Sequence, residues 1–96
     1  MIVQTKIATT ATTLVDTQFE LNHNPNSKKV YFYIDAITNA TAKQIDGRLH
    51  PDAPWTPLVY PTAGSATYTQ VDICSEYRVR TQKSSGSQNI TIILGN

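Results

Sequence analysis

Three side chains that could support acid–base chemistry lie close together in the middle of the sequence. Asp46 and Asp52 flank His50, and a histidine between two carboxylates can act as a general acid or base where the three groups converge. A simpler interpretation is that Asp46 lies in a turn, Asp52 caps backbone donors in a loop, and His50 is exposed. We favour the simpler interpretation, because an active site needs several convergent titratable groups and the chain offers few of them. We expect no catalytic residue and no enzymatic activity.

The single cysteine, Cys74, is the other candidate nucleophile. A lone cysteine excludes an intramolecular disulfide and a cysteine-based zinc site, and neither His23 nor His50 lies in a recognisable catalytic signature. Cys74 follows the alternating residues Val71 and Ile73, so we interpret it as a residue at the edge of a core or at the end of a strand. No Asp-x-Asp-x-Asp run is present to bind calcium. We therefore expect no metal and no cofactor.

The aromatic side chains are more open to a functional interpretation. Trp55 could stack on a sugar ring or anchor a protein partner, although we favour a structural role in which it plugs the end of the fold under its proline-rich loop. Other aromatic and apolar residues should point away from the core by alternation, and a small monomer rarely exposes a large apolar patch. The candidate interface for oligomerisation or docking comprises Tyr31, Tyr33, Ile37, Trp55, Tyr60 and Tyr68, with Ile93 beside them.

The elements that must position these side chains are strands. No segment has apolar residues at helical spacing over several turns, whereas runs of period two recur between turn residues. In one such run, Val15, Thr17, Phe19 and Leu21 alternate with polar residues. We predict seven or eight strands, over residues 2–7, 15–21, 30–37, 40–49, 58–60, 66–73, 77–82 and 90–94, with a hairpin tip at 84–87.

For three of these strands the sequence predicts a specific feature or position in the sheet. Residues 30–37 are apolar on both faces, which predicts a central strand whose outer side is covered. The apolar phase changes within 40–49, from Ala40 and Ala42 to Ile45, Gly47 and Leu49, which predicts a β-bulge near Lys43 and Gln44. Prolines around Trp55 predict a rigid loop that leads into a short edge strand. We expect one domain, 1–96, with an all-β fold: a compact two-layer antiparallel β-sandwich, immunoglobulin-like or jelly-roll-like.

Composition restricts the partners. Eight basic and seven acidic residues give a net charge of +1, which is too weak to argue for nucleic acid. No apolar run approaches the ~20 residues that span a bilayer, and the N-terminus lacks the pattern of a signal peptide. We expect a soluble protein made in a reducing compartment, with no nucleic acid and no membrane among its partners.

The middle and the end of the chain resemble small virion proteins of tailed bacteriophages. In that family an alternating strand leads into a Gly-x-Leu-x-x-Asp-x-x-Trp-x-x-Leu turn, and a Tyr-Arg-Val-Arg strand ends in a Ser/Gly hairpin. Here the turn runs from Gly47 to Leu58, with His50-Pro51 between the leucine and the aspartate, and the later strand starts at Tyr77.

The resemblance implies a non-enzymatic structural component of a bacteriophage particle, above all a capsid decoration (cement, or auxiliary head) protein, with a tail or baseplate protein as the alternative. The implied partners are the major capsid protein or other virion proteins and further copies of the chain, with a trimer as one possible oligomer. The implied location is the virion, after synthesis in the host bacterial cytoplasm. Many weak interfaces in such a particle act together through avidity.

Two other classes compete with this interpretation. One is a carbohydrate-binding or host-adhesion module that uses Trp55 and nearby tyrosines. The other is an accessory domain of a larger enzyme, which we do not favour because the sequence begins with Met and is expected to be complete.

Overall fold

The computed structural model describes residues 3–21 and 29–96, with Ala40 described by its backbone alone. The described residues form eight strands and no helix, as expected from a chain rich in β-branched side chains that pack well on a pleated surface. The strands are β1 (Val3–Thr10), β2 (Val15–Glu20), β3 (Val30–Ile34), β4 (Ala40–Arg48), β5 (Thr56–Val59), β6 (Thr67–Val71), β7 (Glu76–Lys83) and β8 (Gln88–Gly95).

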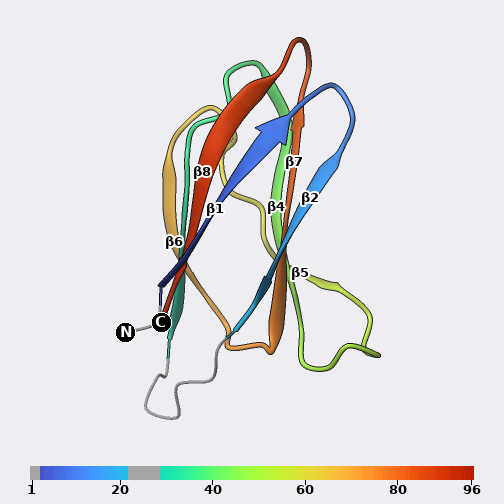
Figure 1. The fold of residues 1–96 in the computed structure, drawn as a ribbon, viewed down its shortest axis with the longest axis vertical. Coiled ribbons are helices and arrows are strands. Elements are labelled where there is room, and N and C mark those ends of the chain that lie inside the picture. The colour runs from blue at the N-terminus through green and yellow to red at the C-terminus, as the bar shows by residue number, and fades with distance from the viewer. Residues whose placement is uncertain (1–2, 22–28) are drawn as a thin grey trace.

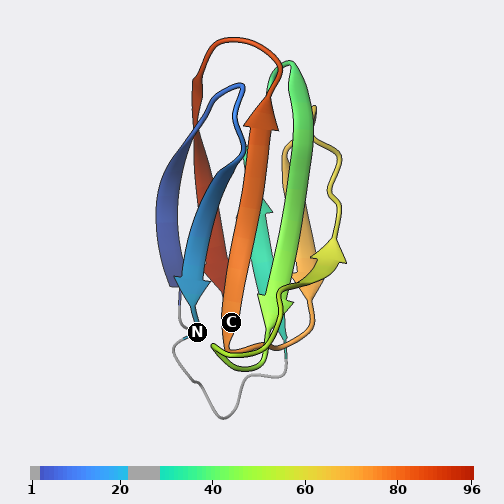
Figure 2. The ribbon, with the colours of Figure 1, turned by 90° about the vertical axis from the view of Figure 1, so that its right-hand side faces the viewer.

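The strands build two four-stranded antiparallel sheets that pack face to face (Figures 1 and 2). Sheet A has the order β1-β8-β3-β6, and sheet B has the order β2-β7-β4-β5. Apart from the link between β4 and β5, every connection crosses from one sheet to the other. This strand order is that of a jelly roll. The predicted two-layer antiparallel sandwich is confirmed, and its connectivity is jelly-roll-like rather than immunoglobulin-like.

The core lies between the sheets and is made of inward side chains that alternate along each strand. Phe32 of β3 lies at its centre, with edge-to-face contacts to Phe19 of β2 at 5.7 Å and to Tyr77 of β7 at 5.3 Å between ring centroids. The other fully enclosed apolar side chains are Val30, Ile34, Ile37, Ile45, Val79, Ile90, Ile92 and Leu94. Such edge-to-face pairs stabilise a core beyond the area they bury.

Tyr77 also ties the turn between β6 and β7 to the core. Its phenolic oxygen donates to the carbonyl of Asp72 at 2.7 Å and accepts from the backbone N–H of Cys74 at 2.8 Å. A tyrosine that bonds the backbone a few residues upstream is the arrangement of the tyrosine corner in other Greek-key sandwiches. It satisfies backbone groups of Asp72 and Cys74 in the turn between the two strands.

Two residues do not lie on the faces that alternation predicted for them. Ile37 is fully buried in the core and does not belong to the exposed aromatic set. The reason is that β3 ends at Ile34, after which the chain changes direction and the N–H of Ile37 donates to the carbonyl of Ala63 at 2.8 Å. Leu49, predicted to point inward, is exposed because it follows the end of β4.

The predicted bulge exists but lies earlier in β4. The register with β7 shifts between Ala40 and Ala42, so Thr41 is the extra residue, and Lys43, Ile45 and Gly47 then share the inward phase. A second irregularity falls between Ile45 and Asp46 in the pairing with β5. The predicted hairpin tip at 84–87 is a turn that connects β7 in sheet B to β8 in sheet A, so the strands on either side do not pair with each other.

Candidate functional site

The outer surface of sheet A carries most of the exposed aromatic residues. The strand registers place outward side chains in rows across all four strands. One row joins Thr5, Ile93, Tyr33 and Tyr68, and the next joins Val3, Gly95, Tyr31 and Gln70. We call these eight residues the aromatic face. None of them is charged.

Side-chain packing organises the aromatic face. The rings of Tyr31 and Tyr68 stack at 5.7 Å between centroids with an interplanar angle of 23°, and Tyr68 remains 73% exposed. Gly95 has no side chain between Val3 and Tyr31, which leaves a shallow pocket of about 120 Å³ lined by Val3, Tyr31, Tyr33, Tyr68, Ile93 and Gly95. An exposed, uncharged group of large side chains on a small protein is typical of a surface that contacts another molecule.

The carboxylate of Asp35 borders the aromatic face. Asp35, just after β3, accepts a hydrogen bond from the backbone N–H of Thr91 at 2.7 Å, and this bond is the main reason that the pKa of Asp35 is lowered. The hydrogen bond between Tyr33 and Asp35 raises the pKa of the Tyr33 phenol, with the carboxylate charge adding to the effect. The ionised carboxylate therefore holds the protonated phenol at the border of the face.

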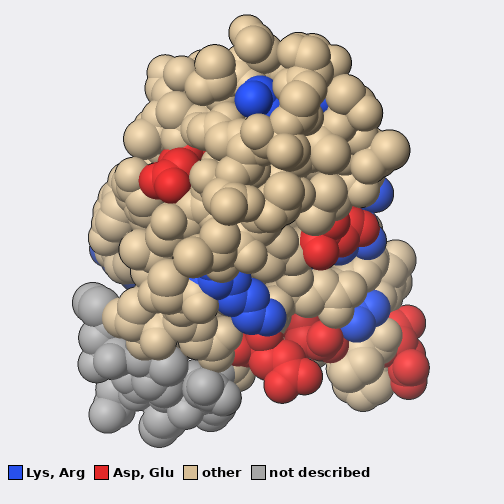
Figure 3. All heavy atoms as spheres, turned by 45° about the horizontal axis from the view of Figure 1, so that its top comes forward, with Lys and Arg blue, Asp and Glu red and all other residues tan. Residues whose placement is uncertain are grey.

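The outer surface of sheet B is charged instead. Arg78 of β7 donates to Oδ2 of Asp46 on β4 from both Nε, at 3.0 Å, and Nη2, at 2.7 Å. Arg80 donates to Asp16 of β2 at 2.9 Å. In Figure 3 the charged side chains lie mainly over the right-hand and lower parts of the view, on the side of sheet B. The two outer surfaces of the sandwich thus differ in chemistry.

Trp55 belongs to the charged surface. Its ring lies 4.1 Å from the guanidinium carbon of Arg48 and 4.8 Å from that of Arg78, measured to the ring centroid. Arg48 in turn forms an ion pair with Glu76 at 3.3 Å. Trp55 is half-buried against these arginines, so the predicted role as a plug at the end of the sandwich is wrong. Cation–π contacts at this distance stabilise the ring where it lies, and they occupy part of the surface that a sugar would need.

The acid–base candidates do not converge. Asp46 is 1% exposed and neutralised by Arg78. His50 and Asp52 are exposed in the loop between β4 and β5, where Nδ1 of His50 accepts the backbone N–H of Asp52 at 3.1 Å. His50 is exposed as predicted, but its imidazole, rather than the Asp52 carboxylate, accepts the backbone donor. Oδ2 of Asp52 lies 3.7 Å from Nδ1 of His50. Asp46, however, lies in a strand rather than in a turn.

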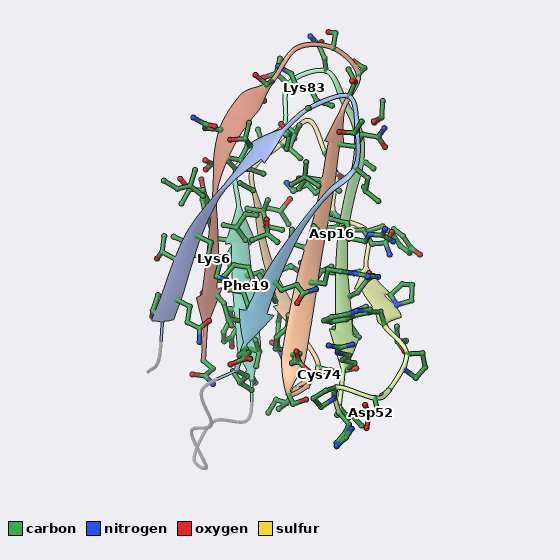
Figure 4. The ribbon with its side chains drawn as sticks, turned by 45° about the vertical axis from the view of Figure 1, so that its right-hand side comes forward. Lys6, Asp16, Phe19, Asp52, Cys74 and Lys83 are labelled. Carbon is green, nitrogen blue, oxygen red and sulfur yellow. The ribbon has the colours of Figure 1, made fainter. Side chains whose placement is uncertain are left out.

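Cys74 lies at the lower end of the sandwich, near the loop that carries Asp52 (Figure 4). It is buried in the core between the end of β6 and the start of β7, in agreement with the predicted place at the edge of a core, and burial is the main reason that the pKa of its thiol is raised. A raised pKa suppresses the thiolate that nucleophilic chemistry requires. His23 lies outside the described residues. Among the residues that the structure describes, no three or more His, Cys, Asp or Glu side chains form a group able to hold a metal ion.

Five of the six predicted interface residues are at least partly exposed, but they do not form one surface. Tyr31, Tyr33 and Tyr68 come together on the aromatic face with Ile93. Trp55 lies on sheet B, and Tyr60, 69% exposed, follows β5 at the edge of that sheet. The prediction missed four members of the face, Val3, Thr5, Gln70 and Gly95, whose places in it depend on how β1, β8, β3 and β6 pair.

The protein was compared with known families, curated proteins and solved structures. No family model, no curated protein and no solved structure matches the chain. In residues 3–21 and 29–96, no helix is long and apolar enough to cross a membrane.

Proposed function

We propose that the protein is a non-enzymatic structural component of a bacteriophage particle, a capsid decoration protein that docks through the aromatic face. The observation that carries this proposal is the contrast between the uncharged aromatic surface of sheet A and the ion-paired surface of sheet B. A surface that stays in water gains little from stacked tyrosines, whereas an aromatic cluster at an interface contributes much of the binding energy. The major capsid protein is the proposed partner, and the virion is the proposed location.

The fold is compatible with this role without establishing it. Jelly rolls occur in viral capsid proteins, in lectins and in cupins, and a fold alone does not define a function. The resemblance of residues 40–58 and 77–94 to small phage virion proteins adds a second, separate reason. A face of this size gives a weak individual contact, and a capsid compensates by presenting many equivalent sites.

The direct test is quantitative mass spectrometry of particles purified from the phage that encodes the chain. The proposal predicts the protein in amounts comparable to the major capsid protein. A few copies for each particle would assign it to the tail or baseplate instead. Its absence from washed particles would exclude a virion role.

A matched pair of variants tests the docking surface. Thr5→Lys places a charge among exposed residues of the aromatic face and removes no buried contact, so we expect it to reduce incorporation at least tenfold. Thr41→Lys makes the same change at the exposed bulge of β4 in sheet B and should leave incorporation unchanged. Equal incorporation of the two variants would show that the aromatic face is not the docking surface.

A carbohydrate-binding role is the second candidate, because the stacked Tyr31 and Tyr68 rings offer an exposed aromatic platform. The Trp55 version of this idea is disfavoured by the two guanidinium groups packed against the indole. A glycan array distinguishes the two functions. Binding that is lost in Tyr68→Ala and kept in Tyr60→Ala, which removes a similarly exposed tyrosine, would favour the carbohydrate-binding role.

A further inference from the structure

The four edge strands of the sandwich differ in how their free backbone groups are protected. An exposed edge presents N–H and C=O groups that can pair with another chain, and proteins block such edges with inward charges, prolines or bulges. Sheet A ends in β1 and β6, and sheet B ends in β2 and β5.

Three of these edges are blocked. On β1, the Lys6 side chain turns toward the opposite sheet and donates to the carbonyl of Gln18 on β2, and Gln4 donates to the carbonyl of Glu20 at 2.5 Å. Figure 4 shows Lys6 and Phe19 facing each other between these strands, with Nζ 5.2 Å from the ring centroid. These contacts use backbone acceptors of β2. The third blocked edge, β5, contains Pro57 and the register irregularity opposite β4.

The fourth edge, β6, has none of these devices. Its sequence, Thr67-Tyr68-Thr69-Gln70-Val71, contains no charge and no proline, and its register with β3 is uninterrupted. Figure 1 shows β6 at the left-hand border of the molecule. The strand is therefore a regular, neutral edge.

The pattern of hydrogen bonds identifies which backbone groups of β6 are free. The N–H of Asp35 donates to the carbonyl of Thr91 at 3.1 Å, so Asp35, and by alternation Tyr33 and Tyr31, direct their backbone groups toward β8. The residues between them bond to β6 through Thr67, Thr69 and Val71. The backbone groups of Tyr68 and Gln70 then point away from the sheet. Both residues are exposed.

We propose that β6 pairs with β6 of a second copy of the chain, antiparallel about a two-fold axis at Thr69. In this register Tyr68 lies opposite the partner's Gln70, and Gln70 lies opposite the partner's Tyr68. All four free N–H and C=O pairs are used, which gives four intermolecular hydrogen bonds. The strand is self-complementary because it carries no charge that would meet a like charge across the axis.

The pairing has a consequence for the aromatic face. It joins the two copies of sheet A into one eight-stranded sheet. The row that ends in Tyr31 and Gln70 of one copy continues into the partner's Tyr68 and the partner's Tyr33. The interface is short, so the dimer is expected to be weak and concentration-dependent in solution. The inference goes beyond the proposed function and does not depend on a virion partner.

Register-specific cross-linking tests the proposal. Opposed Cα atoms of a hydrogen-bonded antiparallel pair are ~5.5 Å apart, within the range of a disulfide. A mixture of Tyr68→Cys and Gln70→Cys proteins should form a disulfide-linked heterodimer under mild oxidation. Either variant alone should not, because two copies of position 70 would lie beyond the ~7 Å that a disulfide can bridge. Cross-linking of each variant alone, or none in the mixture, would overturn this register.

Sedimentation of the unmodified protein from micromolar to millimolar concentration gives the second test. We expect a dimer whose dissociation constant rises at least tenfold in Gln70→Pro, because that N–H makes no bond within the monomer. Gln70→Lys is the alternative variant if the proline disturbs folding, which circular dichroism would reveal. A monomer at every concentration, or a dimer that survives both variants, would contradict the proposal.

Thr5→Lys separates this inference from the proposed function. It lies at the opposite edge of sheet A and should leave the β6 dimer intact while it reduces incorporation into particles. Loss of the dimer in Thr5→Lys would show that the aromatic face, and not the β6 edge, holds the copies together.

Discussion

The ammonium group of Lys43 lies 2.9 Å from the carbonyl oxygen of Ser65, inside the sandwich. The side chain projects inward from β4 and is 4% exposed. It also donates to Oγ1 of Thr67 at 2.9 Å and makes longer contacts, of 3.3 to 3.5 Å, with the carbonyls of Ile34, Asp35 and Thr62. One cation thus connects the end of β3, the chain between β5 and β6, and the start of β6.

Removal of this cation should be costly. In Lys43→Met the oxygens around the ammonium lose their common donor, and we expect the free energy of unfolding to fall by ~3 kcal/mol. Urea denaturation measures the change. Lys83→Met, at the end of β7, is the control and should change stability by less than ~0.5 kcal/mol. A loss in Lys43→Met no larger than in the control would mean that water replaces the ammonium group without penalty.

Gly47 is required by close packing rather than by backbone conformation. A Cβ at this position would lie 2.7 Å from Sγ of Cys74 and 2.8 Å from Cδ1 of Leu58. We expect Gly47→Ala to destabilise the protein by ~1–3 kcal/mol, as overpacking of a core usually does. Gly64→Ala, where a Cβ meets nothing within 4 Å, should be nearly neutral.

A double-mutant cycle assigns the Gly47 effect to its neighbour. Cys74→Ala removes the sulfur that the new Cβ would strike, so the double variant should be more stable than the sum of the single changes predicts, by ~1 kcal/mol. Strict additivity would indicate that Leu58 or the backbone absorbs the overlap instead.

Tyr77 links stability to alkaline pH. Burial is the main reason that its pKa is raised from 10.0 to about 12. The folded protein therefore keeps a proton that the unfolded chain loses between pH 10 and 12, and stability falls as the pH rises through that interval. We expect Tyr77→Phe to be less stable by ~2 kcal/mol below pH 10, because the Cys74 N–H loses its acceptor.

The difference between wild type and Tyr77→Phe should shrink as the pH rises from 10 toward 12. Urea unfolding at several pH values measures it, and tyrosinate absorbance should show one fewer late-ionising phenol in the variant. A difference that stays constant across this interval would show that Tyr77 ionises normally in the folded state.

Local patterns in the sequence predicted much of this fold. Alternation in Val15–Glu20 and in the Tyr31/Tyr33 segment identified strands and their buried faces, since each side chain in a strand points opposite to its neighbours. Prolines near Trp55 correctly placed β5 at an edge, because proline cannot donate to a ladder. Lys43 alternates in phase with Ile45 and Gly47, and this spacing is typical of a side chain that points inward. The change in apolar phase predicted a bulge at this position instead of a buried lysine.

Tertiary structure decided the rest. Ile37 turns inward because β3 ends before it, and the backbone N–H of Ile37 then bonds to the carbonyl of Ala63 in a distant loop. The position of Trp55 depends on Arg48 and Arg78, which reach it only after β4 and β7 pair. The aromatic face and the free β6 edge likewise exist only once four strands from both halves of the chain are in register. By itself the sequence determined which residues alternate, because alternation is a local property of the backbone. Strand order and register depend on contacts between residues far apart in the chain, and these determined which alternating residues meet.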